Sequence, residues 1–159
     1  MSYPEAVYHG PGGERTAWFR SGGSGPDLVY PNGTEVRYVA TGAETDGRFG
    51  IYRWDAGIEP SGPAPHFHRT MSESFFVLSG TIKIYDGNEW IDTHPGDYVY
   101  VPPGGIHGFR NESGALASML LMFAPGAPRE AYFEGQLQLG DMSDGERAAF
   151  YLEHDNLWI

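Results

Sequence analysis

The chain of 159 residues suits a single domain, residues 1–159, because it can enclose one hydrophobic core but is short for two. It contains no cysteine, which excludes disulfides, thiolate nucleophiles and iron–sulfur clusters and leaves nitrogen and oxygen as ligands for any metal ion. A formal net charge of -11 with scattered basic residues argues against nucleic acid and membranes as partners, and the first residues carry no signal sequence. We therefore expect a soluble, cytoplasmic protein.

Residues 1–34 are predicted to form an irregular arm. Glycine, proline and serine dominate this stretch, as in GPGGER and SGGSGPD, and these residues favour turns over regular structure. Scattered apolar side chains are expected to dock the arm on the rest of the domain, namely Trp18, Phe19, Leu28 and Tyr30.

Residues 35–124 form the predicted β core. Short runs rich in β-branched and aromatic residues alternate there with turn residues, which predicts strands at EVRYVA, RFGIYRW, SFFVLSG, TIKIYDG, EWIDT, DYVYVP, HGFRN and ALASMLLMF. The Asp86-Gly87-Asn88 sequence is typical of a tight hairpin, because Asp-Gly tolerates positive φ angles. Many short strands separated by turns indicate an all-β sandwich or closed barrel.

One of these runs leaves its orientation open. Phe49, Ile51 and Arg53 would form one face of the strand, with Tyr52 and Trp54 on the other, and the pattern does not decide which row faces inward. An inward Arg53 could bind an acidic substrate or hold a buried carboxylate. An exposed arginine is the more ordinary expectation.

The C-terminal extension, residues 125–159, contains the one helix that the sequence predicts. Ser143 and Glu146 have the spacing of a capping box, and the sequence ERAAFYLEH supplies helix-forming residues behind it. We therefore expect a helix over about residues 143–154.

His66 and His68 are candidate metal ligands. They are separated by one residue, so in a strand both side chains project from the same face. Pro63 and Pro65 favour an extended backbone just before them, as this geometry requires. Two imidazole rings can therefore converge on one ion.

Glu73 and His107 complete the candidate set. Glu73 begins an apolar run in which a period of two places it on one face with Phe75 and Val77. Burying an ionised carboxylate alone costs several kcal/mol, so an interior Glu73 requires a cation or a metal ion. His107 follows the turn sequence PPGGI and would supply a fourth ligand, and Phe109 shares its face. Phe75, Val77 and Phe109 are expected either to line a cavity or to pack in the core.

Two stretches of this sequence resemble the motifs of the cupin superfamily. The sequence PHFHRTMSESFFVLSG has the spacing of the first motif, carried by His66, His68, Glu73 and Gly80. The sequence GDYVYVPPGGIHGFRN has the spacing of the second motif, carried by Gly96, Pro102, Gly104, His107 and Asn111. One departure is Pro60, which stands where the family often has a glycine, although Gly62 lies nearby.

The resemblance implies a double-stranded β-helix, or jelly-roll barrel. It does not explain the two ends of the chain, for which the sequence itself predicts the irregular N-terminal arm and the one C-terminal helix. It also implies that His66, His68, Glu73 and His107 hold a metal ion in the barrel mouth, as in quercetin dioxygenase-like and germin-like cupins. Histidine and carboxylate ligands suit one divalent transition metal ion, Fe, Mn, Ni, Co, Cu or Zn, and the choice among them stays open.

Such a site leaves coordination positions open, which makes catalysis on a small molecule plausible. The first hypothesis is a dioxygenase that acts on an enolisable or phenolic, flavonol-like substrate, with Glu73 as both ligand and proton acceptor. The alternatives are a metal Lewis-acid cyclase or isomerase acting on a polyketide or a sugar, and a non-catalytic binding protein for a small ligand. A homodimer is expected, because cupin barrels often pair.

Three further histidines lack partners at ligand spacing. For His9, His94 and His154 we expect surface or structural positions.

Overall fold

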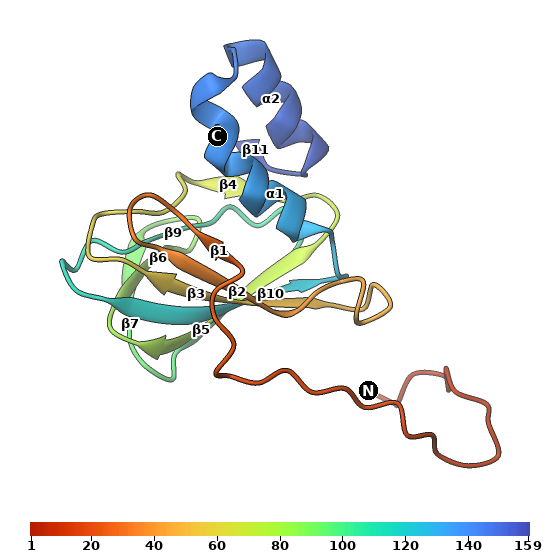
Figure 1. Cartoon of the computed structure of the whole chain (residues 1–159). Helices are drawn as coiled ribbons and strands as arrows, with labels where there is room; N and C mark the ends of the chain where they lie inside the picture. Colours follow the sequence, from red (N-terminus) through yellow and green to blue (C-terminus); the bar gives the residue numbers. More distant parts are fainter.

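The computed structural model describes residues 1–159 and shows a β barrel with a helical unit over one end (Figure 1). The strands are β1 (Leu28–Val29), β2 (Glu35–Ala40), β3 (Gly50–Ala56), β4 (His66–Phe67), β5 (Ser72–Ser79), β6 (Ile82–Tyr85), β7 (Trp90–Thr93), β8 (Tyr98–Val101), β9 (Gly108–Arg110), β10 (Ala117–Ala124) and β11 (Leu157–Trp158). The helices are α1 (Arg129–Gly135), a 3-10 helix (Gln136–Asp141) and α2 (Asp144–Glu153). The predicted β core is therefore confirmed.

Two antiparallel sheets form the barrel. The larger sheet has the strand order β1-β2-β3-β10-β5-β8, and the smaller has the order β7-β6-β9. Their inner faces pack through aromatic rings, since the ring of Phe109 in β9 lies 5.6 Å from that of Trp54 in β3 and 5.9 Å from that of Phe75 in β5. The core therefore lies between the sheets, below the helical unit.

The orientation of β3, which the sequence left open, follows from the burial of its side chains. Tyr52 and Trp54 are buried, whereas Arg53 is on the outer face and pairs with Asp55 at 2.8 Å. The inward row is therefore the aromatic one, and Arg53 faces outward as expected, although its side chain is half-buried. The predicted hairpin is also confirmed, because β6 and β7 pair antiparallel around Gly87, whose φ angle is 97°.

The N-terminal arm docks on the barrel only near its end. Leu28 is buried in β1 and Tyr30 packs against the core, as predicted. Trp18 and Phe19 are exposed, so the prediction that they dock is wrong. The glycine-rich residues 21–25 separate them from β1, and Figure 1 shows the preceding chain running away from the barrel.

The C-terminal extension contains two helices, so the prediction of one is corrected. The predicted helix exists as α2, and Ser143 and Glu146 form the expected capping box. Helix α1 has no side-chain cap and follows Pro128, so it lacks a local start signal. It is stabilised by burying Tyr132 and Phe133 against the core. No helix in the structure is long and apolar enough to cross a membrane.

The helical unit should contribute strongly to stability. The ring of Phe133 is buried against Tyr52 and Trp54, with centroids 5.2 Å and 5.6 Å away. Phe133→Ala should lower the free energy of unfolding by about 3–5 kcal/mol, because it removes buried aromatic packing between α1 and the barrel. Urea denaturation measures this, and Leu152→Ala, at an exposed position of α2, is the control that should change it by less than about 0.5 kcal/mol. Equal losses in the two variants would contradict the packing described.

Candidate metal centre

The structure brings the four predicted residues together at one end of the barrel. His66 begins β4, His68 follows that strand, Glu73 is near the start of β5, and His107 directly precedes β9. All four side chains are buried, and one candidate ligand atom from each lies within 4.8 Å of every other. The pairing of residues far apart in the sequence therefore produces one compact cluster.

Backbone pairing fixes the relative positions of the two histidine segments. His66 and His107 exchange both of their backbone hydrogen bonds, each at 2.8 Å. Gly62, just before β4, has a φ angle of 139°, and a Cβ there would lie 1.9 Å from the carbonyl oxygen of Phe109. Only glycine allows the chain to pass this close to β9. Gly62 therefore helps to place the segment that carries His66 next to the segment that carries His107.

Each histidine ring is held through its Nδ1 atom. The Nδ1 of His66 lies 2.9 Å from the carbonyl oxygen of Ala64, and that of His107 lies 2.9 Å from the carbonyl oxygen of Gly105. The Nδ1 of His68 lies 2.6 Å from the carbonyl oxygen of a C-terminal residue, Asp155. A carbonyl oxygen can only accept, so each Nδ1 must carry the proton, and a neutral ring then presents a bare Nε2.

The Nε2 atoms of His68 and His107 meet the carboxylate of Glu73. Its Oε2 lies 3.1 Å from the Nε2 of His68 and 2.8 Å from the Nε2 of His107. Two lone pairs facing a carboxylate oxygen repel it unless a proton or a metal ion lies between them. This donor set therefore fits a divalent ion, which imidazole nitrogens and a carboxylate bind well.

The charges of the cluster favour a cation at its centre. Burial lowers the pKa of His66 to about 3, and nearby His107 adds to the effect. Burial opposes the ionisation of Glu73, but hydrogen bonds with His107 and His68 outweigh it, and the pKa of its carboxyl group falls below the ordinary value. Burial also opposes the charging of His107, yet its bond to Glu73 raises its pKa. Without a metal, a proton balances the carboxylate, and a metal ion would replace that proton.

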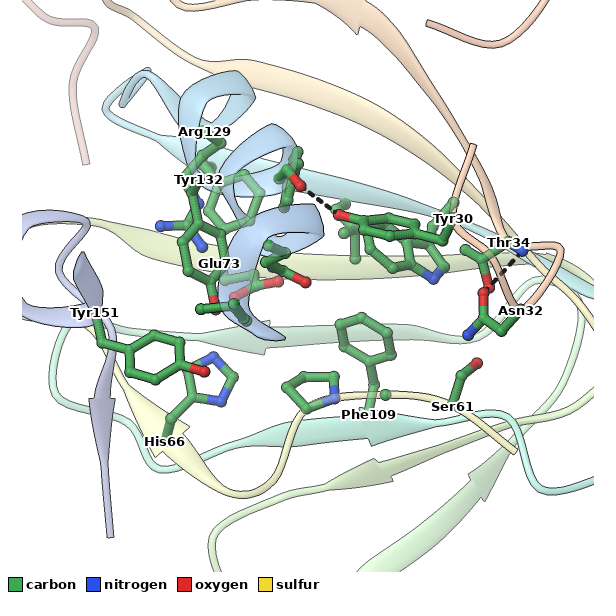
Figure 2. Close-up of a pocket in the computed structure, with 18 of the residues that line it drawn as sticks. Tyr30, Asn32, Thr34, Ser61, His66, Glu73, Phe109, Arg129, Tyr132 and Tyr151 are labelled. Atoms are coloured by element: carbon green, nitrogen blue, oxygen red, sulfur yellow. Dashed lines mark hydrogen bonds between the residues drawn. The ribbon is translucent and has the colours of Figure 1, made fainter. Parts of the chain in front are cut away.

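A cavity of about 210 Å³ lies beside the cluster, between the barrel and the helical unit (Figure 2). His66 and Glu73 of the cluster form part of the cavity wall. Among all residues that line the cavity, only Glu73 and Arg129 carry a full charge. The remaining lining residues are aromatic, aliphatic or uncharged polar, namely Tyr30, Asn32, Thr34, Trp54, Ser61, Gly62, Pro63, Phe109, Leu121, Phe123, Tyr132, Phe133, Gln136, Leu139, Tyr151 and Trp158. The cluster therefore has room for a small molecule next to it, most of whose surface would contact apolar walls.

Comparison with known proteins decides the family. A model of the cupin domain matches residues 55–123, which include the whole cluster. An uncharacterised protein of Streptomyces coelicolor is 38% identical over 76 residues, which are 48% of this chain and 68% of that protein. The chain belongs to the cupin superfamily.

One curated relative of this cupin has a named activity. The quercetin 2,3-dioxygenase of Bacillus subtilis is 30% identical over 109 residues. The match covers 69% of this chain but 31% of the enzyme, so the chain spans about a third of that relative.

Solved structures share the barrel of this cupin at low sequence identity. KdgF from a Halomonas species has a TM-score of 0.61 at 17% identity, over 72% of this chain and 97% of that one. A predicted oxalate decarboxylase from Thermotoga maritima has a TM-score of 0.59 at 16% identity, over 69% and 99%. The polyketide cyclase RemF from Streptomyces resistomycificus has a TM-score of 0.50 at 22% identity, over 57% and 64%. These likenesses establish the jelly-roll fold alone.

The other residues singled out in the sequence fall into two groups. Phe109 lines the cavity, whereas Phe75 and Val77 are buried in the core beneath the cluster. His9 and His94 are exposed, and His154 is half-buried at the end of α2, as expected for surface or structural residues.

Sequence reasoning missed the part of the cupin site that the C-terminal extension supplies. Arg129, Tyr132 and Tyr151 line the cavity, and the ring of Trp158 lies 5.1 Å from that of His66. The carbonyl of Asp155 orients His68. None of these residues belongs to a spaced motif, so no local pattern marks them.

Proposed function

We propose that this cupin is a metal-dependent dioxygenase that acts on a small phenolic or enolisable substrate of the flavonol kind. The observation that carries the proposal is the buried cluster of three histidines and one glutamate on the wall of an apolar cavity. The likeness to part of quercetin 2,3-dioxygenase supports the choice of reaction.

In this proposal the cluster holds one divalent transition metal ion. The ligands are the Nε2 atoms of His66, His68 and His107 together with the carboxylate of Glu73. When bound, the ion supplies Lewis acidity and, if it is redox-active, access to dioxygen chemistry. The backbone carbonyls that bind each Nδ1 keep the rings in the tautomer that a metal ion requires.

Glu73 is the proposed proton acceptor. Its Oε2 contacts two histidines, while its Oε1 accepts no hydrogen bond from the protein. The carboxylate is ionised and lines the cavity, so Oε1 can accept the proton of a substrate hydroxyl group placed there. The aromatic walls would hold a flat substrate and keep bulk water from the acceptor.

The metal content and oxygen consumption of the purified protein test this function. Protein prepared without added metal should contain one redox-active transition metal ion per chain by elemental analysis, and an oxygen electrode should record uptake when a flavonol is added. Glu73→Ala should abolish the uptake, and His94→Ala, at an exposed position, should leave it unchanged.

Two outcomes would replace the proposal. Zinc content with substrate turnover but no oxygen uptake would favour Lewis-acid isomerisation or cyclisation, and cyclisation is the reaction in the name of the polyketide cyclase RemF. Tight binding of a small molecule without turnover would favour a non-catalytic binding protein. We also propose a homodimer, and light scattering that gives the mass of one 17.5 kDa chain would refute it.

A further inference from the structure

Arg129, the first residue of α1, is a buried cation without a carboxylate partner. Its side chain is 3% exposed, and no salt bridge includes it. Its guanidinium group lies over aromatic rings, 4.2 Å from the centroid of Tyr132 and 5.0 Å from that of Phe123. A fully buried charge is costly unless an opposite charge accompanies it. The position therefore needs an explanation beyond packing.

The hydrogen bonds of Arg129 leave donors unused. Its Nη1 donates to the carbonyl oxygen of His154 at 2.8 Å, and its Nη2 donates to the Oδ1 of Asn156 at 3.2 Å. These bonds attach α1 to the C-terminal segment, but a guanidinium group has five N–H donors. The Nε of Arg129 and the Nδ2 of Asn156 are both buried without a partner. Of the two residues, Arg129 alone lines the cavity, and a guanidinium group with unused N–H donors can bind an anion through charge-assisted hydrogen bonds.

Arg129 lies close to the metal centre. Phe123, under its guanidinium group, is the direct neighbour of Glu73 across the pairing of β10 with β5. Figure 2 shows Arg129, Tyr132 and Glu73 on the wall of the same cavity. Even so, no salt bridge joins Arg129 to Glu73, whose Oε2 contacts two histidines instead.

The charge balance of the loaded site points to an anionic ligand. A divalent ion carries two positive charges, Arg129 carries one and Glu73 carries one negative charge, so the cavity would hold two net positive charges. No other lining residue carries a full charge. A cavity this small and apolar concentrates that field, which favours a negatively charged guest and disfavours a neutral one of the same shape.

We propose that Arg129 binds the anionic group of the substrate, and that the natural substrate is a small planar phenolic acid whose carboxylate contacts Arg129 while its ring lies among the aromatic walls. This inference rests on the proposed function, because it assigns the substrate class of the same site. The volume of about 210 Å³ is below that of most pockets for drug-sized ligands, which favours a compact acid.

Calorimetric titration of the zinc-loaded protein with benzoate and with benzamide tests the inference. The two probes have nearly the same shape and differ in charge. Wild-type protein should bind benzoate at least about tenfold more tightly, as expected for one charge-assisted pair. Arg129→Gln should remove the preference, Arg129→Lys should keep part of it, and Arg53→Gln, on the outer face of β3, should leave it unchanged. A wild-type protein that binds benzoate no better than benzamide, or binds neither, would overturn the inference.

Two measurements separate this inference from the function on which it rests. The preference for benzoate should persist in the metal-free protein, since Arg129 does not depend on the ion; a preference that vanishes with the zinc would assign the anion to the metal and overturn the role of Arg129. Zinc stoichiometry, measured on the same samples, reports the metal site independently. If Arg129→Gln fails to fold, the role of Arg129 is still tested by the affinities of the wild-type protein and of Arg129→Lys for benzoate and benzamide.

Discussion

Replacing His66 or Glu73 with alanine should lower the affinity for the metal ion by more than about 100-fold. Loss of a group that only orients a metal ligand lowers the metal affinity by about 10–100-fold. Loss of a ligand should lower it further, and His66 and Glu73 are proposed ligands. Competition with a chromophoric chelator measures the affinity. The barrel should stay folded, because neither change removes an apolar side chain from the core, and the histidines that remain can be neutral.

A matched control shows whether the loss of metal affinity is specific to the cluster or follows from the loss of any histidine. His94→Ala removes an exposed histidine that belongs to no cluster, and the affinity of this variant for the metal should equal that of the wild type. Near-ultraviolet circular dichroism should give the same spectrum for all variants. Wild-type stoichiometry in both His66→Ala and Glu73→Ala would refute the ligand assignment.

Asp155→Ala should lower the affinity for the metal by about 10–100-fold, although Asp155 is not a ligand. Its backbone carbonyl orients His68, and its carboxylate accepts bonds from the backbone N–H of Arg69 at 2.9 Å and of Thr70 at 2.8 Å. Asp155 also has a φ angle of 54°, in the left-handed region that alanine disfavours. The substitution removes the hydrogen bonds that hold this turn, so the carbonyl of residue 155 no longer fixes the ring of His68. Loss of such an orienting group lowers metal affinity by about 10–100-fold.

Two further variants show whether this effect comes from the Asp155 turn. Asp155→Asn keeps an acceptor and tolerates the left-handed conformation, so it should retain most of the affinity. Asp144→Ala removes an exposed carboxylate from the first turn of α2 and should have no effect on metal binding. If Asp155→Ala binds the metal as tightly as the wild type, the C-terminal segment does not position His68.

The barrel and its cluster could be predicted because their signals are local. Short runs of β-branched and aromatic residues between turn residues located the strands, and Glu35–Ala40 matches its predicted run residue for residue. The one-residue spacing of His66 and His68, together with the inward phase of Glu73, Phe75 and Val77, placed the candidate ligands before any contact was known. Strand phase makes such predictions possible, since it fixes which side chains share a face.

The C-terminal part of the site could not be predicted, because long-range contacts create it. His68 and Asp155 are 87 residues apart, and β11 pairs with β4 through two residues that show no alternation. Helix α1 is stabilised by the aromatic residues it buries rather than by its own sequence. Arg129 follows a proline in a short polar stretch that looks like an exposed turn, and only the fold shows that it is buried.

Anomalous diffraction from crystals of the metal-loaded protein would locate the metal ion itself. We expect one strong peak per chain, about 2.0–2.3 Å from the Nε2 atoms of His66, His68 and His107 and from a carboxylate oxygen of Glu73. A peak at another place on the molecule, or a cluster that stays empty in the presence of the divalent ion, would contradict the proposed metal site.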